Sequence, residues 1–239
     1  NVLHVGGPEV LEAQKQQHLR TLRRSLNRAV TSLKEGKRVV CHSGSGFGIF
    51  WWEPWLGAGE APPTGFEGEP TVALPPPESE EFERWLARFP SGARDAARFF
   101  WPGPLALRAR FHFADTTPPW KATAVCPWHP LAMELLSRSG ALLWEPVSQA
   151  LEEELARTAE PKETGEQLRY LLWPEPESKL ELTVLDLSTR PWRLMSQGFI
   201  EGDEVIARIE EPVVLSEERA FPKRPIRTYV PEGKTIIVE

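Results

Sequence analysis

The segment at residues 105–113 constrains the fold of this chain more than any other. Its apolar residues occupy every second position, and Arg108, Arg110 and His112 lie between them. A period of two predicts a β-strand with one buried face and one polar face. A Pro- and Gly-containing turn at residues 101–104 comes directly before the strand. We therefore expect a sheet, on which the cationic row either faces solvent or lines a pocket for an anion.

Helical and extended patterns alternate along the rest of the chain. Apolar residues at steps of three and four predict an amphipathic helix over residues 12–35, with Gly36 as its stop, and the apolar run Arg38–Cys41 predicts a buried strand. Further strands are expected at residues 71–74, 122–126, 141–147, 180–187, 205–209 and 235–238. Further helices are expected at 78–89, 92–100 (capped by Ser91), 130–138, 148–159 and 165–172. The strand-helix-strand unit over residues 122–147 predicts parallel pairing, and the chain is expected to be α/β.

The bulk properties indicate one soluble globular unit. The chain has 239 residues, 41% of them hydrophobic and 26% charged, and no apolar run reaches the roughly 20 residues of a membrane span. With no leader at its start, we expect a cytoplasmic protein that does not contact a membrane. Cys41 and Cys126 fall in apolar strands, which predicts buried reduced thiols. The spacing of His and Cys does not fit a zinc site, and no metal is expected from these residues.

The charge distribution leaves two interpretations of the first predicted helix. The net charge of −6 argues against a surface made entirely for nucleic acid. Between Lys15 and Arg38, however, there is one acid, Glu35, against eight basic residues, namely Lys15, Arg20, Arg23, Arg24, Arg28, Lys34, Lys37 and Arg38. This run is either a solvated helix face or a contact for RNA or phosphate. If it is an RNA contact, Arg20, Arg23, Arg24 and Arg28 are its candidate residues.

A glycine-rich loop at residues 42–48, His-Ser-Gly-Ser-Gly-Phe-Gly, follows the strand Arg38–Cys41. Its alternating glycines allow a ligand to approach the backbone closely. The loop lacks the G-K-[ST] ending of a P-loop and the G-x-G-x-x-G spacing of a dinucleotide fold. By itself the pattern does not identify a phosphate site.

Two segments resemble the YrdC/YciO family of threonylcarbamoyl-AMP synthases. "RVVCHSGSGFGI" is similar to the family's strand followed by P-T-[DE]-T-x-Y-G-L, and "FFWPGPLALRARF" is similar to its F-W-P-G-P-L-T-L. Two later segments follow in the family's order. "CPWHPLAMELL" resembles V-P-x-H-P with a helix, and "LTVLDLSTRPWRLMSQGFI" resembles S-T-V-[VI]-D-L ending near R-P-G-x-I. The resemblance covers residues 25–202.

The resemblance implies an open twisted mixed sheet with flanking helices around a central cavity, over residues 1–202. Residues 203–239 would then be a strand and loop extension packed on the same domain. The family makes threonylcarbamoyl-AMP from threonine, bicarbonate and ATP, for a tRNA modification, and the fold has also been described as binding double-stranded RNA. A synthase of this type would be a nucleotidyltransferase using ATP and Mg²⁺.

The chain departs from the family in its polar residues. Ser43 and Ser45 stand where the family has threonines, and Phe47 stands where it has tyrosine. The family's K-x-R-P segment should follow the loop, yet residues 49–83 contain neither Lys nor Arg. Polar residues of the family are also replaced or missing at Ala106 (threonine), Val125 (arginine), Leu182 (serine), Ser196 (arginine) and Pro146-Val147-Ser148 (the S-A-N motif).

Three functions are compatible with these departures. The first is a divergent YrdC-like protein without the standard ATP and threonine activity, either a pseudoenzyme or a binding module for a less charged ligand or RNA. The alternative is an active nucleotide-dependent carbamoyl- or threonylcarbamoyl-adenylate-forming enzyme with an altered pocket. The third is an interaction or structural partner in an operon-encoded complex. The candidate pocket residues are Ser43, Ser45, Phe47, Arg108, Arg110, Lys121 and Ser148. The ten tryptophans either fill the cavity or belong to the core.

Overall fold

The computed structural model describes residues 8–58, 60, 69–111, 119–148, 150–151, 168–171, 180–209 and 212–215. The helices are α1 (Pro8–Lys34), α2 (Pro54–Ala58), α3 (Glu80–Leu86), α4 (Ser91–Phe100), α5 (Pro130–Ser139) and α7 (Gly202–Ile206). The strands are β1 (Arg38–His42), β2 (Phe47–Trp51), β3 (Thr71–Ala73), β4 (Gly103–Phe111), β5 (Trp120–Cys126), β6 (Leu142–Pro146), β7 (Leu168–Leu171), β8 (Thr183–Asp186), β9 (Trp192–Ser196) and β10 (Val213–Leu215).

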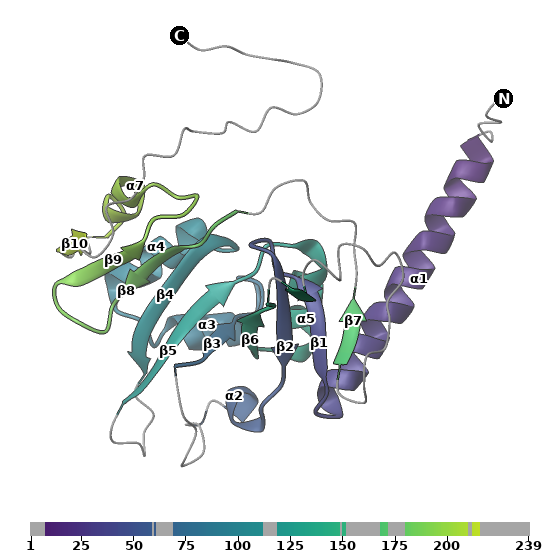
Figure 1. Ribbon diagram of the computed structural model, residues 1–239, viewed down its shortest axis with the longest axis horizontal. Helices are drawn as coiled ribbons and strands as arrows, with labels where there is room; N and C mark the ends of the chain where they lie inside the picture. Colours follow the sequence, from purple (N-terminus) through teal and green to yellow (C-terminus); the bar gives the residue numbers. More distant parts are fainter. Residues whose placement is uncertain are drawn as a thin grey trace, which may run out of the picture.

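The strands form one open mixed sheet of ten strands in the order β10-β9-β8-β4-β5-β3-β6-β2-β1-β7 (Figure 1). Four neighbouring pairs are parallel, namely β1 with β7, β3 with β5, β4 with β8, and β9 with β10. The other pairs are antiparallel. The expected α/β class with an open mixed sheet is therefore confirmed. No helix among the described residues is both long and apolar enough to cross a membrane.

Helices cover both faces of the sheet. On one face, α3 and α4 lie behind β4 and β5 in Figure 1, and the buried Phe82 and Trp85 of α3 share a core with Leu107 and Phe111 of β4. On the other face, α1 and α5 join a second core that includes Ala106 of β4. The burial of β4 alternates as its sequence predicts, so Arg108 and Arg110 lie on the face that α3 and α4 leave uncovered.

The predicted parallel pairing of the two strands in residues 122–147 is wrong. Strand β3 lies between them, and it runs parallel to β5 but antiparallel to β6. The register places Ala73 beside both Val125, near the end of β5, and Leu142, the first residue of β6. Helix α5 therefore leaves and re-enters the sheet at the same end, and β6 runs in the opposite direction to β5.

Two predicted elements have the wrong type. A strand is expected at residues 205–209, but its first two residues belong to helix α7, whose N-cap is Glu201. Val205 and Ile209 are both buried, at a spacing of four that fits a helix. Of the helix expected at 165–172, the described residues 168–171 instead form strand β7, which pairs with the edge of β1. Helix α4 has Pro90 at its N-cap with no side-chain cap, so the predicted cap at Ser91 is also wrong.

The remaining predicted elements in the described residues are present. Helix α1 ends before Gly36, which has a φ of 75°. Strands β1, β3, β5, β6 and β8 and helices α3 and α5 lie where periodicity places them. The strand expected at 235–238, residues 152–159 of the expected helix, and His112 lie outside the described residues. The proposed division of the chain at residue 202 stays a prediction.

Candidate functional site

The glycine-rich loop between β1 and β2 is closed by its own hydrogen bonds. The Ser43 amide and hydroxyl both donate to the Gly46 carbonyl, at 2.8 and 2.9 Å. The Ser45 hydroxyl lies 3.0 Å from the Ser43 hydroxyl. Gly44 and Gly46 have φ values of 110° and 141°, which favour glycine. The structure thus brings both predicted hydroxyls together, but Ser43 is buried and turned into the loop, so Ser45 is the more accessible of the two.

Two tryptophans occupy the space that the loop's glycines leave open. A Cβ atom on Gly44 would lie 2.5 Å from Nε1 of Trp128, and one on Gly48 would lie 2.6 Å from Cδ1 of Trp144. Both distances are too short for non-bonded atoms. In a phosphate-binding loop, the ligand lies close to the backbone. In this loop, two indole rings occupy that space.

Two buried histidines fix the loop and the start of α5. Nδ1 of His42 accepts a hydrogen bond from the Gly44 amide at 3.1 Å. Nδ1 of His129 caps α5 by accepting a hydrogen bond from the Leu131 amide at 3.3 Å. The ring centroids are 5.0 Å apart. An Nδ1 atom that accepts a hydrogen bond carries no proton, so both contacts require neutral imidazoles. Burial lowers the pKa of His129, which agrees with a neutral ring.

This arrangement predicts that the protein loses stability in mild acid. Because the pKa of His129 is lower in the folded state, its contribution is fully present above the ordinary histidine pKa of about 6.5 and declines as the pH falls below it. Urea unfolding at pH 7.5, 6.5 and 5.5 should give a falling free energy of unfolding. His129→Asn, which keeps an N-cap without a titrating ring, should show a weaker decline. An equal decline in this variant would contradict the assignment.

One cross-strand row joins three of the positions at which the family resemblance predicts polar side chains. Val125 of β5 pairs with Ala106 of β4, Ala106 pairs with Val184 of β8, and Val184 pairs with Ser196 of β9. Residues paired across strands face the same side of the sheet. Ala106 and Val125 are buried, and Leu182 packs against the same apolar cluster, which includes Trp144. Where arginine and threonine side chains were expected, this row presents an apolar surface ending in one serine.

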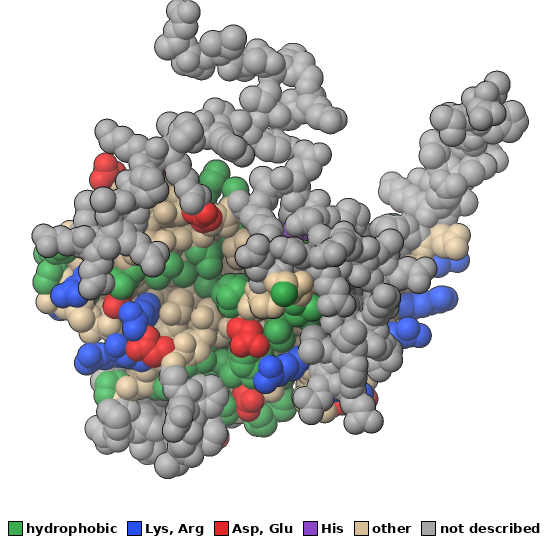
Figure 2. All heavy atoms as spheres, in the orientation of Figure 1, with side chains coloured by type: hydrophobic (Ala, Val, Ile, Leu, Met, Phe, Trp, Pro, Cys, Tyr) green, Lys and Arg blue, Asp and Glu red, His purple; other side chains and the backbone are tan. Residues whose placement is uncertain are grey.

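Two of the cations on the same face, Arg108 and Lys121, are held by carboxylates. Arg108 forms ion pairs with Glu69 and, at 3.4 Å, with Asp186, and Lys121 lies 3.1 Å from the other oxygen of Glu69. Partial burial opposes ionisation of Glu69, but hydrogen bonds from Lys121 and Arg108 outweigh it and hold its pKa below the usual range. Figure 2 shows basic and acidic side chains side by side on this face of β4 and β5.

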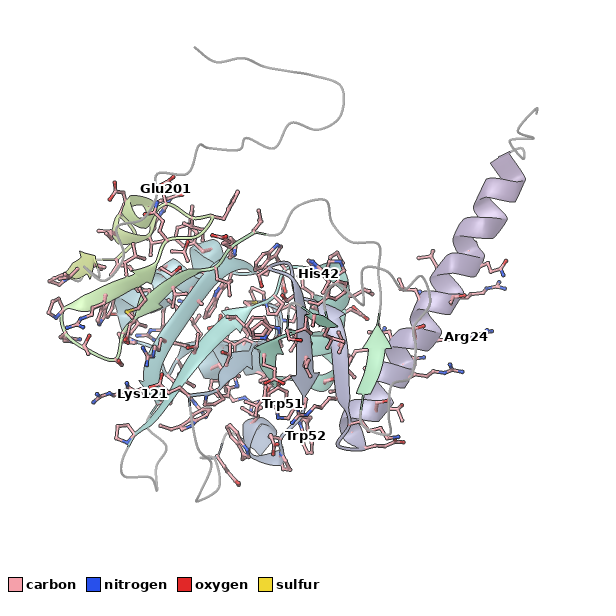
Figure 3. All side chains as sticks on the ribbon, in the orientation of Figure 1. Arg24, His42, Trp51, Trp52, Lys121 and Glu201 are labelled. Carbon is pink, nitrogen blue, oxygen red and sulfur yellow. The ribbon has the colours of Figure 1, made fainter. Side chains whose placement is uncertain are left out.

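The structure does not assemble all of the predicted site residues. Lys121 lies at the far end of β5 from the glycine-rich loop, and Figure 3 shows it well separated from His42. Arg110, paired in register with Lys121, is exposed. Phe47 is buried in a small cluster with Val40, so it is a core residue. Ser148 is exposed, and its hydroxyl accepts the Leu151 amide at 3.3 Å.

Sequence reasoning missed several residues that shape this face. Glu69 comes from a Pro- and Gly-rich stretch with no periodic signal, and only the fold carries it to Arg108. Asp186, in contrast, lies inside the "LTVLDL" segment, where its motif position could have identified it. Cys41 and Cys126 are free and buried, as predicted, and burial raises the pKa of each to about 12. Within the described ranges, no group of three or more His, Cys, Asp or Glu side chains could hold a metal ion.

Comparisons with known proteins show relatives in structure but not in sequence. No family model matches the chain, and no curated protein matches it. It is similar to P. abyssi Sua5 complexed with L-threonine, with a TM-score of 0.57 and 18% identity over 79% of this chain and 58% of that chain. A double-substituted variant of the same Sua5 gives a TM-score of 0.59 and 18% identity over 80% of this chain and 58% of that chain.

A third structure is matched over most of its own length. E. coli YciO matches with a TM-score of 0.52 and 16% identity, over 73% of this chain and 89% of that chain. The chain thus spans somewhat more than half of Sua5 and nearly all of YciO. These structural matches agree with the resemblance of the "FFWPGPLALRARF" segment, and the chain has the YrdC/Sua5-like fold.

Proposed function

We propose that this protein is a YrdC-fold binding module that does not make threonylcarbamoyl-AMP, and that its ligand carries little negative charge. The apolar row of Val125, Ala106 and Val184 supports the proposal most directly. The family resemblance predicts arginine at Val125 and threonine at Ala106. Their replacement by small apolar side chains on adjacent strands removes hydrogen-bond donors from one continuous part of the sheet.

The electrostatics of the same face support the proposal. A triphosphate brings several negative charges, and each charge that loses water needs a cationic partner or Mg²⁺. Arg108 and Lys121 are already paired with Glu69, and Asp186 adds a second carboxylate beside Arg108. An incoming triphosphate would have to displace these carboxylates or lie beside them. Asp186 also accepts a hydrogen bond from the Ser188 amide at 2.8 Å, so both of its carboxylate oxygens already have partners.

A turnover assay tests the loss of activity. The full chain is incubated with ATP, Mg²⁺, threonine and bicarbonate, and pyrophosphate release is followed beside an active threonylcarbamoyl-AMP synthase. We expect release at the rate of the protein-free blank. Threonine-dependent release above this blank that increases with protein concentration would refute the proposal.

The alternative function is a nucleotide-dependent enzyme of the threonylcarbamoyl-AMP synthase type with an altered pocket. One observation favours it. Arg110 and Arg193 are exposed on the same face as Arg108, and neither forms an ion pair with another described residue. These two cations could meet phosphate oxygens that Arg108 and Lys121 do not reach. Under this alternative, Arg110→Gln should reduce any pyrophosphate release.

Glu69→Gln should increase the affinity of this face for anions. The substitution keeps the side-chain shape but removes the charge that now holds Arg108 and Lys121. Because a partly exposed ion pair contributes about 1 kcal/mol or less, we expect a gain of up to about fivefold in inorganic pyrophosphate affinity by calorimetry. Glu83→Gln is the matched control, because Glu83 pairs with Arg98 at 2.9 Å on a different surface. An equal gain in both variants would show that only net charge matters.

A further inference from the structure

Two large apolar side chains on the surface lie among charges of opposite sign. Leu19 of α1 is 41% exposed, and Phe199, between β9 and α7, is 60% exposed. A single exposed apolar side chain is ordinary on a soluble protein. The charged residues around these two therefore decide what each surface can bind.

The surroundings of Leu19 are basic. Residues 13–34 contain no Asp or Glu. Figure 1 shows the first half of α1 projecting away from the body, and Figure 2 shows basic side chains along the helix. Steps of three and four residues link Leu19 to three exposed arginines, none of which forms an ion pair with another described residue. We call these four residues, Leu19, Arg20, Arg23 and Arg24, the arginine face.

The surroundings of Phe199 are acidic. Residues 194–207 contain no Lys or Arg, and the next cation, Arg208, is stacked on Phe99 at 3.6 Å from the ring centroid. The Phe199 amide donates to the Glu181 carbonyl at 2.9 Å, which fixes the backbone that carries the exposed ring. Three exposed acids follow it, and none forms an ion pair with another described residue. We call these four residues, Phe199, Glu201, Asp203 and Glu204, the acidic patch.

The two surfaces lie at opposite ends of the molecule. Figure 3 shows Arg24 of the arginine face at one end and Glu201 of the acidic patch near the other. Within one chain they do not meet, whereas two copies can bring them together. We infer that the arginine face of one copy binds the acidic patch of a second copy in a head-to-tail contact. This inference goes beyond the proposed function and does not depend on the state of the sheet face.

The two surfaces are complementary in chemistry as well as in charge. A guanidinium donates two parallel hydrogen bonds to a carboxylate, so arginine suits the acids of α7. The Phe199 ring packs against Leu19 and the aliphatic stems of the arginines. Because the contact joins two different surfaces, each pair of copies keeps one free surface of each kind, and further copies can add to it.

A second copy accounts for both surfaces at once. A polyanion or an anionic membrane would pair with α1 alone and leave Phe199 and the acids of α7 without a role. A membrane-bound helix also inserts its apolar side into lipid, and much of the apolar side of α1 is already packed in the core with α5 and β1. The RNA contact predicted from the sequence for these arginines and for Arg28, which is also exposed, stays a prediction.

The net charge of −6 sets the conditions for this contact. Two copies repel each other as whole molecules, so the attraction comes from the local charges alone. Added salt screens such exposed charges over about 8 Å at physiological ionic strength, and the association should therefore weaken as salt increases.

Sedimentation velocity of the full chain over a range of protein concentrations, at low and at high salt, tests the inference. The α1 variant, Arg20→Glu/Arg23→Glu, reverses the arginine face, and the α7 variant, Glu201→Lys/Glu204→Lys, reverses the acidic patch. Circular dichroism checks that every variant remains folded. Two controls make the same charge changes at exposed residues on or next to α3 and α4, namely Arg84→Glu/Arg98→Glu and Glu78→Lys/Glu80→Lys.

We expect the wild type and both controls to associate at low salt and to dissociate at high salt. The α1 variant and the α7 variant should each self-associate at least about tenfold more weakly. The α7 variant reduces the magnitude of the net charge, so general repulsion between copies predicts the opposite result for it. An equimolar mixture of the two variants should associate again, because the reversed arginine face is complementary to the reversed acidic patch.

Phe199→Ser tests the apolar part of the contact without a change in charge. Its loss of apolar burial should weaken association about tenfold. Val214→Ser is the control, because Val214 is also exposed but lies on β10 outside both surfaces. A wild type that stays monomeric at low salt, equal weakening by the matched controls, weakening by only one of the two charge variants, or a mixture that does not regain association would each overturn the inference.

Discussion

Replacing Trp144 by alanine is expected to lower the free energy of unfolding by about 3–5 kcal/mol, the usual loss for a large buried aromatic side chain. The residue is only 8% exposed and belongs to the apolar cluster that also contains Ala106 and Val125. Its Nε1 atom is buried with no hydrogen-bond partner among the described residues. Trp144→Phe should therefore cost much less, because it keeps most of the ring and removes a buried polar atom that is unsatisfied.

A double-mutant cycle tests whether the Trp144 ring fills the space over Gly48. Gly48 does not need a positive φ, so Gly48→Ala should destabilise only through its overlap with the indole, by about 1–3 kcal/mol. In the Trp144→Ala background that cost should vanish, which urea unfolding followed by circular dichroism can measure. An unchanged cost in that background would show that the indole does not occupy this space.

The second large effect is expected for Thr183→Val, which should lower the free energy of unfolding by about 2–4 kcal/mol. The buried Thr183 hydroxyl donates to the Ile200 carbonyl at 2.8 Å and accepts the Gly198 amide at 2.9 Å. Valine has the same shape but leaves both backbone groups unsatisfied, at about 1–3 kcal/mol for each buried group. These bonds tie the segment after β9 back to β8, which also places Ser196 beside Val184.

The serine variant separates the hydroxyl from the methyl group. Thr183→Ser keeps both hydrogen bonds and should lose only about 1 kcal/mol of apolar burial. Thermal or urea unfolding of the two variants in parallel provides the comparison. Equal losses for valine and serine would mean that packing, not hydrogen bonding, makes Thr183 important.

Periodicity predicted the elements whose burial repeats regularly. Strand β4 and helices α1 and α5 each show one apolar face, and each lies where the sequence places it. Periodicity failed where a short segment fits both a helix and a strand. The segment from Val205 to Ile209 was predicted as a strand, although these two residues have helical spacing. The acidic residues in the first turn of α7 favour the helix, because negative charge is stabilising at a helix N-terminus.

Sheet order and the partners of the cations could not be predicted from local sequence. The insertion of β3 between β5 and β6 depends on pairing between segments about 50 and 70 residues apart, for which a period carries no information. For the same reason Arg108 was identified as a candidate cation, while its partner Glu69, 39 residues away, was not. The family resemblance predicted the fold and the substituted positions, but not that Ala106, Val125 and Ser196 lie in one row.

Calorimetry of ATP binding tests the central claim most directly. The full chain is titrated with ATP in the presence of Mg²⁺, threonine and bicarbonate, and the Glu69→Gln variant is titrated in parallel. The apolar row and the paired cations predict no binding by the wild type up to millimolar ATP, and at most weak binding by the variant. Submillimolar binding by the wild type would contradict the account, and it would direct attention to Arg110 and Arg193 as the cations that hold the phosphates.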